Sequence, residues 1–138
     1  MPEKKPLTEL PSKNTNDMQW EATRFSDFHV KILAFQHKCN FSIGKMDPGG
    51  TNFAHAHPFP QARYVLEGEF IVNGKTYGPG SFIEFPPFVR YESFSPKGGV
   101  WLQIQVPNAD TGDCPLDPYG HAYGKADDEA RGKSETAA

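Results

Sequence analysis

The sequence predicts an all-β fold, a sandwich or jelly-roll barrel built from about eight short antiparallel strands. Glycine and proline each occur 13 times in 138 residues, which is more than a helical protein of this length carries and indicates many turns. Turn sequences also interrupt the central part of the chain at intervals suited to short strands. They are Asp-Pro-Gly-Gly at 47–50, Glu-Gly at 67–68, Asn-Gly at 73–74, Gly-Pro-Gly at 78–80, Phe-Pro-Pro-Phe at 85–88 and Ser-Pro-Lys-Gly-Gly at 95–99.

The first strand is predicted at residues 28–32, where Phe28, Val30 and Ile32 alternate with polar residues. A period of two is typical of a strand that buries one of its faces. Further along the chain, residues 70–77 are predicted to form a hairpin. The Asn-Gly pair at its centre tolerates the positive φ angles that a tight two-residue turn requires.

The last strand is predicted at residues 101–106, again from alternation. Trp101, Gln103 and Gln105 fall on one face, and the aliphatic residues between them fall on the other. Two amides on one face suit a polar cavity that orients a ligand, but a face turned to solvent accounts for them equally well. The pattern leaves open which face points into the barrel.

The chain divides by composition into three parts. Residues 28–106 hold ten of the 11 Phe and are predicted to form the barrel. Residues 1–27 have Trp20 and Phe25 as their only large apolar anchors, so we expect an arm that packs on the barrel or on a dimer partner. Residues 107–138 are acidic and lack Phe, Ile, Val and Trp, which predicts a C-terminal tail.

Charge and hydropathy argue against several classes of partner. The net charge is −3 and no basic run is longer than Lys4-Lys5, so we expect no nucleic-acid partner. No apolar stretch approaches the roughly 20 residues that span a membrane, and the N-terminus lacks the apolar core of a signal peptide. We therefore expect no membrane association and a cytoplasmic location.

The pattern most informative about function is His55-Ala56-His57 on a predicted strand. Residues two apart on a strand share a face, so both imidazoles can reach one ion. A bend at residues 58–60 then leads to Gln61, whose side-chain carbonyl can return to the same cavity. Arg63 has the same strand parity as Gln61, so it either faces the cavity and pairs with an anionic substrate or lies in solvent.

These residues resemble the first sequence motif of the cupin family. That motif consists of a glycine, a His-x-His pair, a glutamate and a second glycine, and this chain supplies Gly50, His55, His57, Gln61 and Gly68 in that order. The spacing fits the family except for one residue fewer between the first glycine and the first histidine. The acidic position is occupied by a neutral amide.

The second cupin motif is matched by residues 78–81 and 85–91. Phe88 stands where the family usually has glycine, and Tyr91 stands where it usually has its last metal histidine. The resemblance covers residues 48–106 and implies a double-stranded β-helix, or jelly-roll, cupin barrel of the single-domain RmlC-like kind. The segment that leads into the barrel, residues 20–33, is loosely similar to the corresponding segment of the cupins related to anti-sigma-factor metal domains and aromatic-ketone dioxygenases.

The resemblance also implies a metal site. A typical cupin metal is held by three histidines and a glutamate, so His55 and His57 are the implied metal ligands here and Gln61 the third. Tyr91 is expected to be a fourth ligand or a proton donor, although a buried tyrosine that packs and makes one hydrogen bond is an alternative. The implied cofactor is a divalent metal ion, nominally Fe(II), with Mn, Zn or Ni as alternatives.

The leading functional hypothesis is a mononuclear metal enzyme, dioxygenase-like, that acts on a small oxygenated or aromatic molecule. One alternative is a metal-free isomerase, epimerase or lyase that uses a histidine as general base and Tyr91 as acid, as sugar-epimerase relatives in the superfamily do. The other is a module that binds a ligand or metal without catalysis, since one fold hosts all three. Because cupin barrels usually dimerise, we also expect a homodimer.

Overall fold

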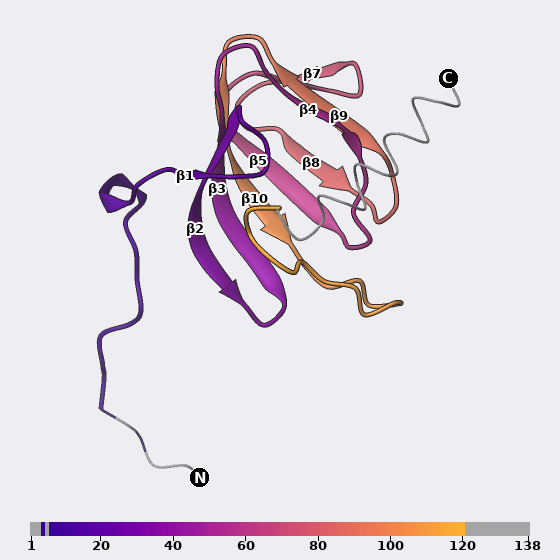
Figure 1. Ribbon diagram of the computed structural model, residues 1–138. Helices are drawn as coiled ribbons and strands as arrows, with labels where there is room; N and C mark the ends of the chain where they lie inside the picture. The colour runs from indigo at the N-terminus through magenta and orange to yellow at the C-terminus, as the bar shows by residue number, and fades with distance from the viewer. Residues whose placement is uncertain (1–3, 5, 121–138) are drawn as a thin grey trace.

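The computed structural model describes residue 4 and residues 6–120, and its strands form two antiparallel sheets (Figure 1). The larger sheet has six strands in the order β1 (Glu21–Ala22), β2 (Phe28–Gln36), β3 (Cys39–Met46), β10 (Gly99–Gln105), β5 (Gln61–Gly68) and β8 (Phe82–Phe85). The smaller sheet has the order β4 (Gly50–His55), β9 (Tyr91–Ser95), β6 (Phe70–Val72) and β7 (Lys75–Tyr77). One short 3₁₀ helix, η1 (Thr15–Asp17), precedes them.

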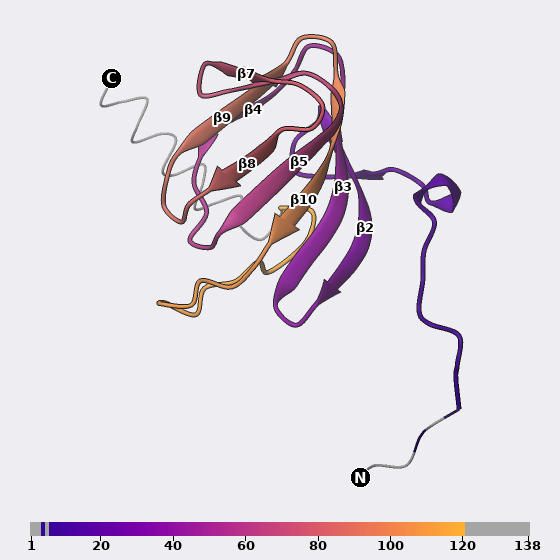
Figure 2. The same cartoon turned by 180° about the vertical axis from the view of Figure 1, so that it is seen from behind.

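The two sheets face each other as the two layers of a barrel, which is visible from both sides (Figures 1 and 2). This arrangement confirms the predicted all-β jelly-roll fold. The described residues between Phe28 and Gln105 form nine strands, one more than the sequence suggested. None of the described residues belongs to a helix long and apolar enough to cross a membrane.

The predicted hairpin is present as β6 and β7. Asn73 and Gly74 connect the two strands with φ angles of 48° and 81°, the positive values that a two-residue primed turn needs. Asn73 also fastens this turn to the neighbouring chain, because its side chain donates to Arg90 O and accepts from Glu92 N. The turn chemistry and the tertiary contacts therefore favour the same conformation.

The core is centred on Trp101, which is fully buried between the sheets. Phe28 stacks on its ring at a centroid distance of 5.0 Å, and Phe70 meets it edge-on at 4.7 Å. Gly44 on β3 leaves room for this group, since a Cβ there would lie 2.7 Å from both Phe28 and Trp101. The absence of a side chain at residue 44 is thus a packing requirement.

Strand β10 turns its amide-bearing face inward. Trp101, Gln103 and Gln105 are buried, whereas Leu102 and Ile104 lie on the outer face of the six-stranded sheet and are partly exposed. The sequence left open which face of this strand points into the barrel, and in the structure it is the face that carries the amides. The inner face of this strand is more polar than its outer face, which indicates a polar cavity inside the barrel.

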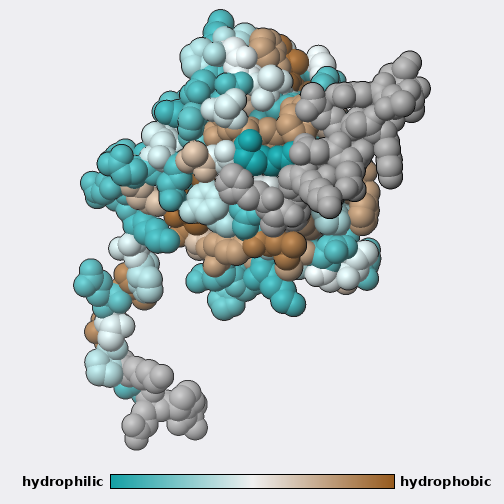
Figure 3. Space-filling view, in the orientation of Figure 1, coloured by the Kyte–Doolittle hydropathy of each residue, from teal (hydrophilic) through white to brown (hydrophobic). Residues whose placement is uncertain are grey.

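The N-terminal segment meets the barrel through Trp20 and β1. The Trp20 ring lies under the ammonium groups of Lys31 and Lys45, at 4.5 and 4.7 Å from its centroid. Before that point the chain extends away from the barrel and is mostly hydrophilic on the face shown in Figure 3. Leu7 and Leu10 are exceptions, with exposed fractions of 102% and 78%.

Candidate functional site

The five residues singled out in the sequence line one cavity between the sheets. They are His55, His57, Gln61, Arg63 and Tyr91. The cavity is small, with a volume of about 40 Å³, which is room for a few water molecules or for a ligand of a few heavy atoms. Each of the five side chains is therefore placed where it can act on the same ligand.

Strand pairing explains this convergence. His55 ends β4 and is paired with Tyr91, the first residue of β9. Gln61 and Arg63 lie two residues apart on β5, so both point to the buried face. His57 follows β4 in the connection to β5. The site thus combines residues from both sheets, at the end of the barrel where β4, β5 and β9 meet.

The two histidines and Tyr91 form a compact group. The ring centroids of His55 and His57 are 5.0 Å apart, and that of Tyr91 lies 4.5 Å from His55. His55 Nδ1 lies 2.7 Å from the carbonyl oxygen of Phe53. Because a carbonyl only accepts, Nδ1 carries the hydrogen and Nε2 carries the lone pair. His57 Nε2 lies 3.1 Å from the Tyr91 hydroxyl.

Gln61 belongs to a chain of buried amides that leads to the same hydroxyl. Its Nε2 donates to Tyr91 Oη at 3.3 Å, and its Oε1 accepts from Gln105 Nε2 at 2.6 Å. Gln105 Oε1 in turn accepts from Asn40 Nδ2 at 2.9 Å, and Asn40 Oδ1 accepts from the Ser42 hydroxyl at 2.6 Å. Each amide in the chain orients the next, and the last one presents an N–H group to Tyr91.

Arg63 is a buried cation held among aromatic rings. Its guanidinium carbon lies 4.5 Å from the Trp101 ring centroid and 5.4 Å from that of Tyr91. Its Nη1 donates to Ser93 Oγ at 3.1 Å. Burial lowers the pKa of Arg63, while the neighbouring Tyr91 hydroxyl favours its charged form. Arg63 therefore faces the cavity, as one of the two sequence hypotheses held.

Both histidines are neutral at physiological pH. The pKa of His55 is lowered to about 4, and burial is the main cause. The positive charges of Arg63, Arg24 and Arg90 lower it further. Burial also lowers the pKa of His57 to about 3, with His55 and Arg63 contributing. A neutral imidazole is the form that accepts a proton or ligates a metal.

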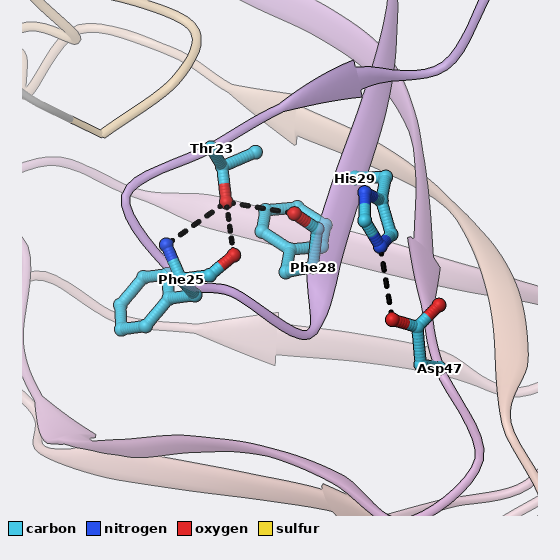
Figure 4. Close-up of polar contacts among 5 residues, drawn as sticks. All are labelled: Thr23, Phe25, Phe28, His29 and Asp47. Carbon is cyan, nitrogen blue, oxygen red and sulfur yellow. Dashed lines mark hydrogen bonds and ion pairs between the residues drawn. The ribbon is translucent and has the colours of Figure 1, made fainter.

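Two segments far apart in the sequence cover the cavity. The loop between β1 and β2 is shaped by Thr23, whose hydroxyl donates to Phe28 O at 2.9 Å and accepts from Phe25 N at 3.1 Å (Figure 4). Next to it, Arg24 N donates to Tyr119 O at 3.0 Å. Residues 117–120 thereby return from the C-terminal region to line the cavity.

At the base of β2, His29 Nε2 pairs with Asp47 at 3.0 Å (Figure 4).

The donor set does not fit a resident divalent ion as it is arranged. The described residues contain no group of three or more His, Cys, Asp or Glu side chains that could hold a metal ion. Gln61 turns its N–H group toward Tyr91, and an N–H group cannot ligate a cation; its oxygen is engaged by Gln105. His55 and His57 offer two neutral nitrogen donors, and a third donor from Gln61 requires its amide to turn.

Several buried polar residues in or near the cavity were not singled out in the sequence, and of these Asn52 lines it. Asn40, Asn52, Ser42 and Ser93 are buried near the site although each looks like an ordinary polar strand residue. A signal exists on β3, where Asn40 and Ser42 alternate with Phe41 and Ile43. Sequence alone favours burial of the aromatic and aliphatic face, whereas the structure buries the polar one.

Comparisons with known proteins identify the fold. No family model and no curated protein matches the sequence. Among solved structures, an RmlC-like cupin from Shewanella frigidimarina superposes with a TM-score of 0.64 at 25% identity, over 74% of this chain and 95% of that chain. KdgF from a Halomonas species gives a TM-score of 0.64 at 20% identity, with 72% and 97% covered. The polyketide cyclase RemF from Streptomyces resistomycificus gives 0.60 at 17%, with 83% and 93% covered.

These matches define the class of protein. The chain has the fold of the RmlC-like cupins, as the two sequence motifs implied. Its structural neighbours include a polyketide cyclase and a predicted oxalate decarboxylase from Thermotoga maritima, so enzymes occur among them. At these identities the likeness to the two enzymes concerns the fold, and the reaction has to be argued from the site.

Proposed function

We propose that this cupin is an acid–base enzyme, an isomerase or lyase acting on a small molecule, with His55 as general base and Tyr91 as general acid. One observation carries this proposal: Tyr91 Oη lies between His57 Nε2, at 3.1 Å, and Gln61 Nε2, at 3.3 Å, at the cavity between the sheets. A histidine and a tyrosine that share one buried cavity supply the two groups that proton transfer needs.

The hydrogen bonds assign a direction to each proton. Gln61 donates to Tyr91 Oη, so the hydroxyl's own hydrogen is available to His57 Nε2 or to an oxygen of a bound molecule. His55 donates from Nδ1 to the backbone, which leaves the lone pair of Nε2 to accept a proton. The acid and the base are therefore distinct groups on neighbouring strands.

The chemistry balances without an oxidant or a cofactor. His55 takes a proton from a carbon next to a carbonyl group, and the electron pair of that C–H bond forms a C=C bond. Tyr91 gives its proton either to the carbonyl oxygen, which yields the enol of an isomerase reaction, or to a departing hydroxyl, which leaves as water in a lyase reaction. Gln61 and Arg63 stabilise the negative charge that forms on Tyr91.

Solvent-deuterium exchange tests this proposal. The full-length protein is incubated in D₂O with a panel of small oxo and hydroxy carbonyl compounds, and loss of the C–H signal is followed by proton NMR. We expect enzyme-dependent exchange that His55→Ala and Tyr91→Phe each remove, in protein depleted of metal by a chelator. If no compound exchanges, or if exchange survives both substitutions, the proposal is wrong.

The second candidate is the metal-dependent dioxygenase. It is favoured by the Nδ1 hydrogen bond of His55, because such a bond orients an imidazole with Nε2 open to a metal. On this hypothesis Gln61→Glu tightens binding of Fe(II), Mn, Zn or Ni, since it adds a carboxylate. Elemental analysis of protein purified without a metal-affinity tag separates the two candidates. The dioxygenase is favoured if the wild type holds about one equivalent of metal and if His55→Ala and His57→Ala each lose it.

A further inference from the structure

Two polar atoms buried at the cavity have no hydrogen-bond partner among the described residues. They are Arg63 Nε, a donor, and Asn52 Oδ1, an acceptor. The side chains are only 4% and 1% exposed, and both line the cavity. Buried polar groups are nearly always hydrogen-bonded in folded proteins. An unpaired donor and an unpaired acceptor in one cavity therefore point to a ligand.

The two atoms belong to neighbouring positions. Asn52 on β4 is paired in register with Ser93 on β9. Ser93 Oγ accepts a hydrogen bond from Arg63 Nη1 at 3.1 Å, so Arg63 contacts the residue that is paired with Asn52. A single small molecule can consequently reach both Arg63 and Asn52.

The charge of Arg63 specifies one end of that molecule. Among the described residues Arg63 has no carboxylate partner, and its guanidinium is surrounded by the rings of Trp101, Phe85 and Tyr91. A buried charge is normally paired with an opposite charge. Arginine matches a carboxylate through two parallel hydrogen bonds, which would use the idle Nε–H.

We propose that the cavity binds a small hydroxy acid, whose carboxylate pairs with Arg63 and whose hydroxyl donates to Asn52 Oδ1. This inference rests on the proposed function for what happens to the bound molecule, but binding itself does not require turnover. The pairing with Arg63 places the molecule beside the Tyr91 ring, whose centroid is 5.4 Å from the guanidinium carbon. Tyr91 is then beside the bound molecule, and His55 lines the same cavity.

Three matched probes test the proposal: lactate, propionate, which lacks the hydroxyl, and lactamide, which lacks the charge. Binding to the full-length protein is measured by NMR titration, with the Arg63 Nε–H resonance as the reporter. We expect lactate to bind about 10- to 100-fold more tightly than lactamide, and to bind more tightly than propionate. Lactate and propionate should shift the Nε–H signal, and lactamide should not.

Two substitutions assign the preferences to residues. Arg63→Met should remove the preference for lactate over lactamide, and Asn52→Leu should remove the preference for lactate over propionate. Arg63→Met should also melt at an equal or higher temperature, because an apolar side chain replaces a buried unpaired charge. Arg90→Met is the matched control, since Arg90 is exposed and does not line this cavity. If Arg63→Met fails to fold, the Nε–H signal of the wild type still decides the question.

Three outcomes overturn the proposal: no binding of lactate, equal binding of all three probes, or an Arg63→Met protein that keeps the preference for lactate. Failure of the proposed function is distinguishable from these outcomes. His55→Ala and Tyr91→Phe should still bind lactate with the same preference over lactamide. A protein that shows this preference but catalyses no exchange would refute the acid–base function and leave the hydroxy-acid site in place.

Discussion

At the residue scale, the chemistry of the cavity depends on which atom carries each hydrogen. His55 is fixed by the carbonyl of Phe53, and Gln61 is fixed by Gln105. Tyr91 contacts the other polar residues of the site. Its hydroxyl contacts His57 and Gln61, and its ring contacts His55. Its hydroxyl should therefore matter more than its ring.

Replacing Tyr91 by Phe tests this expectation. The ring contacts with His55 and Phe85, both at 4.5 Å, remain possible, so the fold should be retained. Loss of the proton donor should lower turnover by about 10²- to 10⁴-fold. Exchange rates in D₂O and circular dichroism measure the two effects. Tyr64→Phe, an exposed position, is the control, and an unchanged rate in Tyr91→Phe would show that Tyr91 only packs.

The buried histidines also make stability depend on pH. Their pKa values, about 4 for His55 and about 3 for His57, are below the usual 6.5. Below pH 6.5 the unfolded chain binds protons that the folded chain excludes, so the free energy of unfolding falls as the pH drops from 6.5 toward 4. We expect the melting temperature at pH 4.5 to be at least about 5 °C lower than at pH 7.

A double variant isolates this contribution from that of other groups. Replacing His55 and His57 by Gln should reduce the difference between the two melting temperatures, because glutamine does not titrate. His37→Gln, at an exposed position, should leave the difference unchanged. If the wild type, the double variant and His37→Gln all show the same difference in melting temperature between pH 7 and pH 4.5, other residues cause the acid sensitivity.

At the scale of elements, β3 supports the site in two ways. Asn40 and Ser42 begin the amide chain that orients Gln61, and Gly44 lets the strand approach the ring of Trp101. The same strand thus contributes polar contacts at one end and close packing at the other. Both depend on its register with β10, in which Gly44 pairs with Trp101.

Replacing Gly44 by Ala should destabilise the protein by about 1–3 kcal/mol, the usual cost of overpacking a core. The new methyl group would meet Phe28 and Trp101 at 2.7 Å. Gly78→Ala is the matched control, because no atom lies within 4 Å of a Cβ at that position, and its stability should be close to that of the wild type. Urea unfolding measures both, and equal stabilities would contradict the packing argument.

At the scale of the whole molecule, the expected homodimer stays a prediction. The outer face of the six-stranded sheet exposes Tyr64 and Phe82, which are paired in register, together with Leu66. Leu7 and Leu10 of the N-terminal arm are also exposed. Apolar groups in both places suit a dimer in which the arm of one chain packs on the sheet of the other.

Light scattering after size exclusion tests this arrangement. We expect a dimer for the wild type and a monomer for a chain without residues 1–12. Phe82→Lys should act like the deletion, whereas Phe94→Lys, an exposed phenylalanine of the smaller sheet, should remain dimeric. A monomeric wild type would refute the prediction, and a dimeric Phe82→Lys would place the interface elsewhere.

The sequence by itself determined the features that depend on local chemistry. Asn73-Gly74 dictates a tight hairpin because few other residues accept two successive positive φ angles. The period of two on β5 puts Gln61 and Arg63 on one face. The prediction that His55 and His57 lie on one strand was wrong for His57, because β4 ends at His55 and His57 reaches the cavity from the connection to β5. These local rules, with the cupin motifs, were sufficient to predict the fold and to single out five of the residues that line the cavity, although the orientation of Arg63 stayed open.

Only the tertiary structure decided how those residues are engaged. The amide of Gln61 is oriented by Gln105, 44 residues away, which is itself held by Asn40, 65 residues away. The burial of Trp101, Gln103 and Gln105 depends on which face of β10 meets the second sheet, and alternation alone is symmetric between the two faces. The physical reason is the same in each case: a polar side chain takes its orientation from its partners, and strand pairing brings those partners from distant parts of the chain.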